Sequence, residues 1–200
     1  MSSNPLLVIG LGNPGGQYQG SRHNVGAEVV SILAERLGLK LGKYRGPASI
    51  ARTVYEDRDL ILARPKTYMN DSGVAGARLV RDFKVALGDV LVVYDELDLT
   101  VGRIRLLERG GTAGHNGMRS LQDHWRSQQF PRLRIGIGRP PVGQEPIEFV
   151  LGRPSGREQE QLQRACVRAA DAVLAVAQDG LEQAMTEYNR VDPKADADAS

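Results

Sequence analysis

Short apolar runs, each bounded by turn-forming or polar residues, recur along the chain and predict buried strands. The runs are Leu6–Leu11, Leu60–Ala63, Val90–Tyr94 and Leu133–Ile137. Residues Gly102–Leu107 alternate instead, which places Arg103 and Arg105 on one face of a strand and Ile104 and Leu106 on the other.

Between these runs, apolar residues recur at spacings of three and four, which predicts amphipathic helices. One helix covers Val25–Leu37. A second follows Ser72, with cap groups at Asn70-Asp71-Ser72. Its apolar stripe consists of Val74, Ala77, Val80 and Phe83. A long stripe from Leu162 to Ala177 ends at Asp179-Gly180, and a last helix starts at Leu181.

Strands and helices alternate along the chain, which predicts an α/β fold with helices covering a twisted, mixed and mostly parallel sheet. We expect a single catalytic domain over residues 1–191 and a flexible tail over residues 192–200, where the sequence becomes small and polar. In such sheets, functional residues collect in the loops at the strand ends.

Charge is unevenly distributed, although the net charge is only +2. Residues 101–140 hold eight arginines against Glu108 and Asp123, a local field that suits a polyanionic partner or forms a solvated surface. Cys166 is the single cysteine, in a helical context that favours a small buried role. The chain has no signal-peptide pattern and no long apolar stretch, so we predict a cytoplasmic protein.

A glycine-rich turn, Gly10 to Gly15, matches the spacing of a dinucleotide-binding loop. The context argues against that interpretation, because a polar segment rather than a helix follows and no acid stands at the end of a second strand. The segment instead contains Asn13, Tyr18 and His23, and a loop histidine beside such groups is either a surface residue or a candidate base.

Three carboxylates, Asp95, Glu96 and Asp98, follow another predicted strand. Such a cluster can bind Mg²⁺, orient a histidine or cap a turn. We expect no metal, because the chain has only three histidines and no recognised metal-binding spacing.

A second glycine-rich loop, Gly110 to Gly117, leads into a predicted helix, Met118–Trp125, beside Asn116. This arrangement either caps the helix or receives an oxyanion, a carbonyl or a phosphate. The sequence has no serine or cysteine nucleophile motif, so an activated water is the simplest nucleophile for a hydrolase.

Together these segments resemble the bacterial-type peptidyl-tRNA hydrolase family over almost the whole chain. Six blocks carry the resemblance, in this order: VIGLGNPGGQYQGSRHNVG, RPKTYMNDSG, VVYDELDLTVG, GGTAGHNGMRS, RLRIGIGRP and FVLGRPS. The resemblance implies a phosphorylase/hydrolase-like fold, a monomer without a cofactor, and hydrolysis of the ester between a peptide and the 3′ end of tRNA.

The resemblance also implies roles for particular residues. His23 would be the general base, Asp95 its carboxylate partner and Asn13 a contact near the scissile ester. Binding roles would fall to Tyr18, Tyr68, Met69, Asn70 and Asn116. A non-catalytic RNA-binding relative, as in the chloroplast intron-splicing branch, is the alternative; the intact pair His23 and Asp95 favours the enzyme.

Phosphate contacts are expected from the arginines of the basic segment, which are Arg103, Arg105, Arg109, Arg132 and Arg134. Arg105 and Arg134 are the leading candidates. One departure concerns Leu107, because many relatives carry a basic residue there that is thought to hold the tRNA 5′ phosphate. Leucine cannot do so, and Arg105 or Arg109 would have to substitute.

Overall fold

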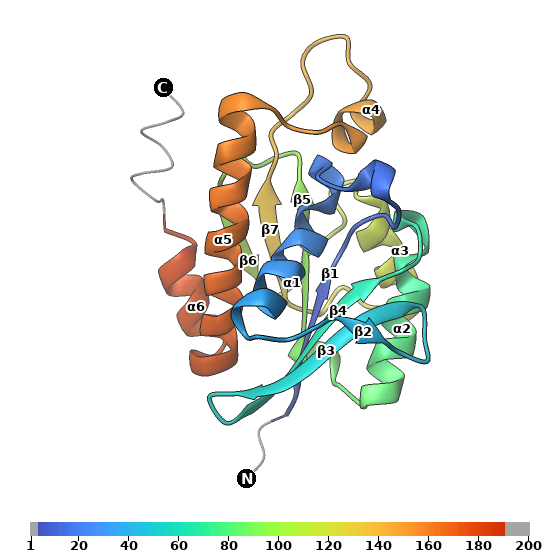
Figure 1. Cartoon of the computed structure of the whole chain (residues 1–200), viewed down its shortest axis with the longest axis vertical. Helices are drawn as coiled ribbons and strands as arrows, with labels where there is room; N and C mark the ends of the chain where they lie inside the picture. Colours follow the sequence, from blue (N-terminus) through green and yellow to red (C-terminus); the bar gives the residue numbers. More distant parts are fainter. Residues whose placement is uncertain (1–3, 191–200) are drawn as a thin grey trace.

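The sheet at the centre of the molecule explains why several strands are continuously apolar. In the computed structural model, which describes residues 4–190, seven strands form one sheet in the order β2-β3-β4-β1-β5-β7-β6 (Figure 1). The strands are β1 Leu6–Gly10, β2 Gly42–Lys43, β3 Ala48–Tyr55, β4 Arg58–Pro65, β5 Val90–Glu96, β6 Ile104–Leu107 and β7 Arg132–Gly136. The central strands β4, β1, β5 and β7 are parallel, and β2, β3 and β6 run antiparallel to their neighbours.

Helices cover both faces of this sheet (Figure 1). They are α1 Val25–Arg36, α2 Ser72–Phe83, α3 Asn116–Trp125, α4 Pro146–Leu151, α5 Gly156–Asp179 and α6 Leu181–Tyr188. One core lies under α1, α5 and α6, and the other lies under α2 and α3. Alternate residues of β1 enter opposite cores, Leu6 and Val8 the first and Leu7 and Ile9 the second. Because both faces are buried, the strand has no polar positions.

The mixed sheet is confirmed, but the sequence did not predict the hairpin on its antiparallel side. Strands β3 and β4 form a hairpin whose turn residues, Glu56 and Asp57, have φ of 45° and 62°. A turn with two positive φ values matches the twist of a hairpin, but asparagine and glycine are its usual residues. The turn contains neither residue, so the sequence contains no hairpin signal. The short helix α4 was also not predicted, because its residues show no clear apolar spacing.

The predicted apolar stripe of α2 is correct only in part, because Val80 and Phe83 pack against the core but Val74 does not. Val74 is 46% exposed, whereas Gly73, Ala75 and Gly76 are buried. A Cβ at Gly73 would lie 2.2 Å from the backbone oxygen of Ser120, so the glycines allow α3 to pack directly on α2. In the first turns of the helix, close packing of small residues therefore decides which side is buried.

The predicted cap of α2 is also different. The helix begins without a side-chain cap, and the hydroxyl of Ser72 donates a hydrogen bond to the Met69 carbonyl at 2.7 Å. The long stripe of α5 is confirmed, with Leu162, Cys166 and Val173 buried. No helix within residues 4–190 is long and apolar enough to cross a membrane. The expected tail at residues 192–200 lies outside the described residues.

Candidate active site

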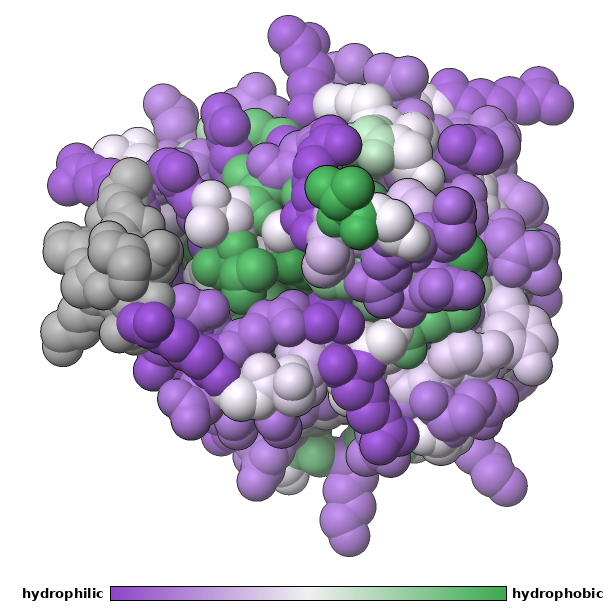
Figure 2. All heavy atoms as spheres, turned by 90° about the horizontal axis from the view of Figure 1, so that it is seen from above, coloured by the Kyte–Doolittle hydropathy of each residue, from purple (hydrophilic) through white to green (hydrophobic). Residues whose placement is uncertain are grey.

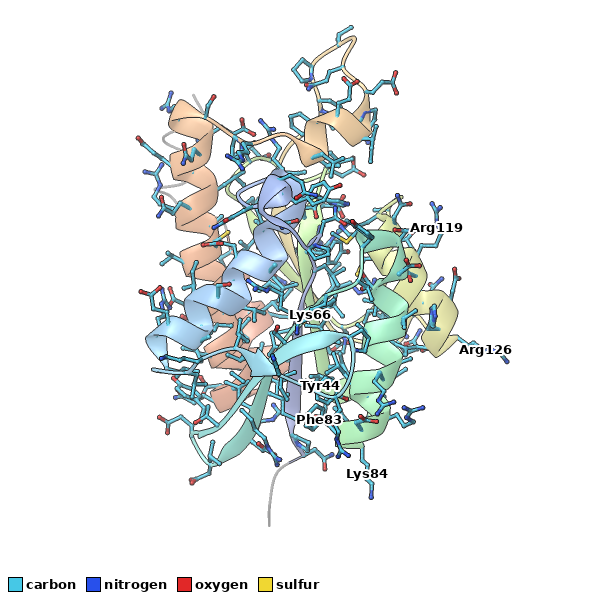
Figure 3. The ribbon with its side chains drawn as sticks, turned by 45° about the vertical axis from the view of Figure 1, so that its right-hand side comes forward. Tyr44, Lys66, Phe83, Lys84, Arg119 and Arg126 are labelled. Carbon is cyan, nitrogen blue, oxygen red and sulfur yellow. The ribbon has the colours of Figure 1, made fainter. Side chains whose placement is uncertain are left out.

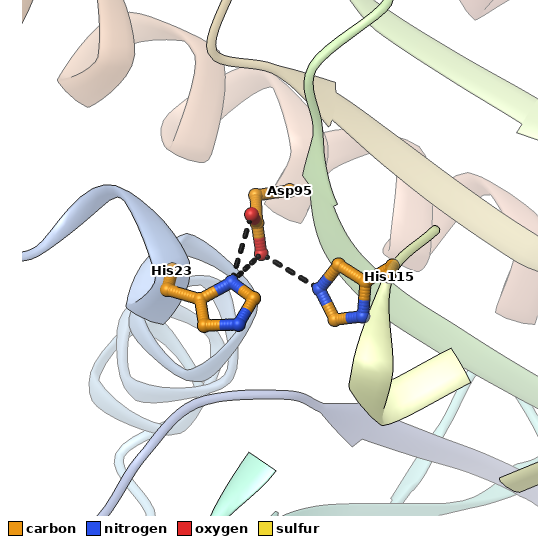
Figure 4. A group of neighbouring side chains, drawn as sticks. All are labelled: His23, Asp95 and His115. Carbon is orange, nitrogen blue, oxygen red and sulfur yellow. Dashed lines mark hydrogen bonds and ion pairs between the residues drawn. The ribbon is translucent and has the colours of Figure 1, made fainter. Parts of the chain in front are cut away.

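Asp95 lies at the carboxyl end of β5, in the middle of the sheet. Its side chain is 2% exposed, so its negative charge requires partners inside the protein. Two imidazole rings supply them (Figure 4). Strand β5 is buried along its whole length, which fixes the position of the carboxylate.

His23 is the first partner, and the expected contact is present. The ring belongs to a 3₁₀ turn, Arg22–Asn24, just before α1. Its Nδ1 lies 2.9 Å from both carboxylate oxygens of Asp95, although the two residues are 72 positions apart. An ionised carboxylate only accepts hydrogen bonds, so Nδ1 carries the proton and Nε2 is left with its lone pair. This is the tautomer that a general base requires.

His115 is the second partner, and the sequence interpretation missed it. Its Nε2 lies 2.9 Å from Asp95 Oδ1, and its Nδ1 accepts a hydrogen bond from the Met118 amide at 3.2 Å. Because Nδ1 is an acceptor, the proton sits on Nε2 and points to Asp95. The available signal was the position of His115 directly before a helix start, where a side chain commonly accepts a backbone amide.

The two partners determine the electrostatics of the cluster. Burial alone would raise the pKa of Asp95, but the neighbouring His23 and His115 outweigh it and hold the pKa below its usual range. Burial lowers the pKa of His23, whereas the charge and hydrogen bond of Asp95 raise it more, so the net pKa lies above its ordinary value of 6.5. His23 is therefore a stronger base than a free imidazole.

Asn13 is held in a fixed orientation by Met69 and by Asn24, the residue that follows His23. Its backbone amide donates to Asn24 Oδ1 at 2.8 Å, and Asn24 Nδ2 donates back to the Asn13 carbonyl at 3.0 Å. The side-chain oxygen of Asn13 accepts the Met69 amide at 2.8 Å. This contact assigns the remaining side-chain group, the NH₂, as a donor available to a ligand.

A pocket of about 360 Å³ lies over the cluster. His23, His115 and Asn116 contribute polar groups, and Ile147 and Val150 of α4 contribute an apolar wall. Figure 2 views this end of the molecule, where hydrophilic side chains surround a central group of hydrophobic ones. Such a pocket, mostly apolar with a few convergent polar groups, is typical of a site for an organic substrate.

Of the other predicted binding residues, one is buried and the rest are at least partly exposed to solvent. The rings of Tyr18 and Tyr68 lie edge to face with centroids 6.4 Å apart, and Tyr68 is 54% exposed. Asn70 and Asn116 are exposed. Met69 is buried, so its side chain offers little surface to a ligand, and its backbone amide holds the side chain of Asn13.

The arginines differ from one another. Arg132 is fully buried and donates to the carbonyls of Gly110 and Gly111, so its interpretation as a phosphate ligand is wrong. Arg134 pairs with the buried carboxylate of Glu96, which already balances its charge. Arg105 is exposed on the edge strand β6.

Arg22 connects the loop of His23 to two other elements. Its guanidinium donates two hydrogen bonds of 2.6 Å to the Glu158 carboxylate of α5 and lies 4.2 Å from the centre of the Phe149 ring of α4. Its backbone amide donates to the Gly152 carbonyl at 3.1 Å. The residue before the candidate base is therefore held on several sides.

His23, Asp95 and His115 are also the residues that could hold a metal ion, with ligand atoms within 4.8 Å of one another. However, His23 Nδ1 and His115 Nε2 are the atoms that donate to Asp95. A cation could bind there only after both ring protons left, because imidazole binds metals through a deprotonated nitrogen. The hydrogen bonds to Asp95 therefore compete with a metal ion for these atoms.

Comparison with known proteins identifies a family. Residues 7–197 match the sequence profile of the family described as peptidyl-tRNA hydrolase. The chain is 45% identical to the peptidyl-tRNA hydrolase of Rhodococcus jostii over 92% of this chain and 97% of the relative. It is also 45% identical to a mitochondrial one of Oryza sativa over 92% of this chain and 74% of that relative. A crystal structure of peptidyl-tRNA hydrolase from Acinetobacter baumannii superposes with a TM-score of 0.89 at 36% identity, covering 96% of this chain and 98% of the other.

Proposed function

The chain belongs to the peptidyl-tRNA hydrolase family, and on that premise we propose that His23 activates a water molecule to cleave the ester between the peptide and tRNA. Family membership makes the protein a hydrolase of ester bonds with peptidyl-tRNA as its substrate. A monomeric state and a cytoplasmic location belong to the proposal. The observation that carries the mechanism is the 2.9 Å contact between His23 Nδ1 and Asp95, which leaves Nε2 as a base.

The proposed reaction starts with a water bound between His23 Nε2 and the ester carbon. As the water oxygen attacks, Nε2 takes the proton, and Asp95 stabilises the imidazolium that forms. The tetrahedral intermediate then collapses, and the proton passes to the 3′ oxygen of the departing tRNA. A positioned base of this kind contributes about 10²- to 10⁴-fold to the rate.

Asn13 supplies the electrophilic contact in this proposal. Its oxygen is held by the Met69 amide, so its NH₂ donates to the carbonyl oxygen of the substrate, where negative charge develops. Asn70 and Asn116 hold the peptide main chain and the 3′ nucleotide, because an amide both donates and accepts. Tyr18 and Tyr68 provide aromatic faces for a base or ribose.

The tRNA phosphates are proposed to contact Arg105, which is exposed at the edge of the sheet. Arg134 is the second candidate in this proposal, but its guanidinium is already paired with the Glu96 carboxylate and would have to bind phosphate at the same time. Phosphate and main-chain contacts carry no sequence information, so they suit an enzyme that must accept many peptides and many tRNAs.

Release of an N-acetylated amino acid from tRNA tests the proposal. We expect His23→Ala to lower the rate about 10²- to 10⁴-fold with little change in tRNA binding, and Asp95→Asn to lower it less. His124→Ala is the matched control, since that exposed histidine packs between α3 and Gly73 of α2 and does not line the pocket over Asp95. A His23→Ala variant that keeps most of the rate would refute the base assignment. Binding without release by the unmodified protein would favour the RNA-binding alternative.

A further inference from the structure

A second hollow lies beside the active site and has no role in the steps above. We call it the Asn13 groove. It has a volume of about 550 Å³, and its lining includes Asn13 and Asn24 from the loop after β1, and Arg64 and Lys66 from the end of β4. Strands β1 and β4 are parallel neighbours, so the segments that follow them leave the sheet side by side.

Asn13 joins the groove to the catalytic centre. The proposed function places its NH₂ at the ester, and the same residue lines the groove. In the same proposal, the pocket over His23 and Asn116 receives the ester. A peptide that extended from that ester past Asn13 would enter the groove, and the residue before the esterified one would lie there.

The wall of the groove is suited to a polypeptide of any sequence. Gly12, Gly15, Gly16 and Gly20 contribute to the lining, so few side chains obstruct the approach of a substrate main chain. Selectivity in the groove must then come from its few charged residues.

Those charges are predominantly positive. Arg64 and Lys66 are exposed, and neither forms an ion pair within residues 4–190; the Arg64 guanidinium reaches only the Ser31 hydroxyl, at 3.3 Å. Glu28 is the acidic residue of the lining. Figure 3 shows Lys66 above the β2–β4 layer between α1 and α2, and Lys84 at the far end of α2.

We propose that the Asn13 groove binds the residue preceding the esterified one and that Arg64 and Lys66 make the enzyme prefer an acidic side chain there. The inference rests on the proposed function. Exposed ion pairs are weak, so the preference over the uncharged isostere is about three- to fivefold in kcat/KM. Such a preference biases the rate without excluding other peptides.

The test compares N-acetyl-Asp-Phe-tRNA with N-acetyl-Asn-Phe-tRNA in each variant. We expect the Asp/Asn ratio of kcat/KM to be about three to five in the unmodified protein and about one in the double variant Arg64→Gln, Lys66→Gln. Glu28→Gln should increase the ratio, because it removes the opposing charge. Lys84→Gln, which removes one positive charge outside the groove, should leave the ratio as it was.

A ratio of one in the unmodified protein, or a ratio that survives the double variant, would overturn the proposal. Equal rate losses on both substrates would also overturn it, since they would indicate a contact to tRNA. If neither substrate is hydrolysed, the proposed function fails instead. Titration with N-acetyl-Asp-Phe-amide and its Asn counterpart, followed by NMR shifts of Arg64 and Lys66, then decides the groove proposal without turnover.

Discussion

At the scale of single residues, the site depends on one buried carboxylate shared by two histidines. Asp95 accepts from His23 and from His115, and the Met118 amide fixes the proton position on His115. Two donors satisfy the buried charge better than one, and the second ring holds the carboxylate in place for the first. His23 keeps a free Nε2 because its other nitrogen is engaged.

The rate should depend on pH through His23. Its pKa lies above 6.5, and only the neutral ring can accept a proton, so kcat/KM should fall as the pH decreases through that raised value. A pH profile of kcat/KM measures the midpoint, which Asp95→Asn should shift to lower pH by removing the charge. A midpoint below 6.5 in the unmodified protein would contradict this prediction.

The same shift affects folding with the opposite sign. A raised folded-state pKa means that His23 contributes stability fully below its unfolded pKa, and this contribution is lost as the pH rises through the folded value. Deprotonation of His23 therefore removes this stabilisation and at the same time produces the neutral ring that acts as a base.

At the scale of elements, two helices approach each other through glycines. In α2, a Cβ at Gly76 would lie 2.4 Å from Leu121 Cδ2 of α3, and Gly73 is equally confined. Helix α3 begins beside His115, and its first residue is Asn116. The packing of α2 on α3 therefore also sets the position of one wall of the active site.

Gly73→Ala should destabilise the protein. The new methyl group would meet the Ser120 carbonyl at 2.2 Å, and overpacking of this kind costs about 1–3 kcal/mol, more than the helical preference of alanine returns. Denaturant unfolding measures the loss. Gly88→Ala is the control, because no atom lies within 4 Å of its Cβ position, and it should leave stability the same or slightly higher. Equal stability of the two variants would contradict the close-packing explanation.

At the scale of the whole molecule, fewer arginines of residues 101–140 are available on the surface than the sequence suggests. The basic segment has a local excess of arginine, yet Arg132 is buried against carbonyls and Arg134 is paired with Glu96. Arg139 is paired with Asp98 as well. The field available to a polyanion is therefore smaller than the segment suggests and is concentrated on exposed residues such as Arg105.

Arg105→Gln should weaken tRNA binding and reduce the dependence of the affinity on salt. Loss of one phosphate contact lowers the slope of log K against log salt concentration by about 0.7–0.9. Binding titrations at several salt concentrations measure it. Leu107→Lys should steepen the slope by a similar amount if the tRNA 5′ phosphate lies against the edge strand β6, which holds both Arg105 and Leu107. Arg52→Gln, on β3 and paired with Asp59, is the control. An unchanged slope in Arg105→Gln would place the phosphate site elsewhere.

The sequence by itself determined what depends on neighbours along the chain. Strands buried on both faces, the long stripe of α5 and the polar residues at strand ends are local patterns, and they led to the α/β class and to His23, Asp95 and Asn13. The family resemblance supplied their roles. The structure then placed His23 and Asp95 in contact, as expected.

Only the tertiary structure decided what depends on contacts between distant segments. It placed His115 on Asp95, paired Arg132 and Arg134 with groups of the protein, and buried Gly73 and Gly76 of α2 while leaving Val74 exposed. The physical reason is that a hydrogen bond, an ion pair or a close helix contact is selected by the partner that folding delivers. A residue's own neighbours in the sequence do not carry that information.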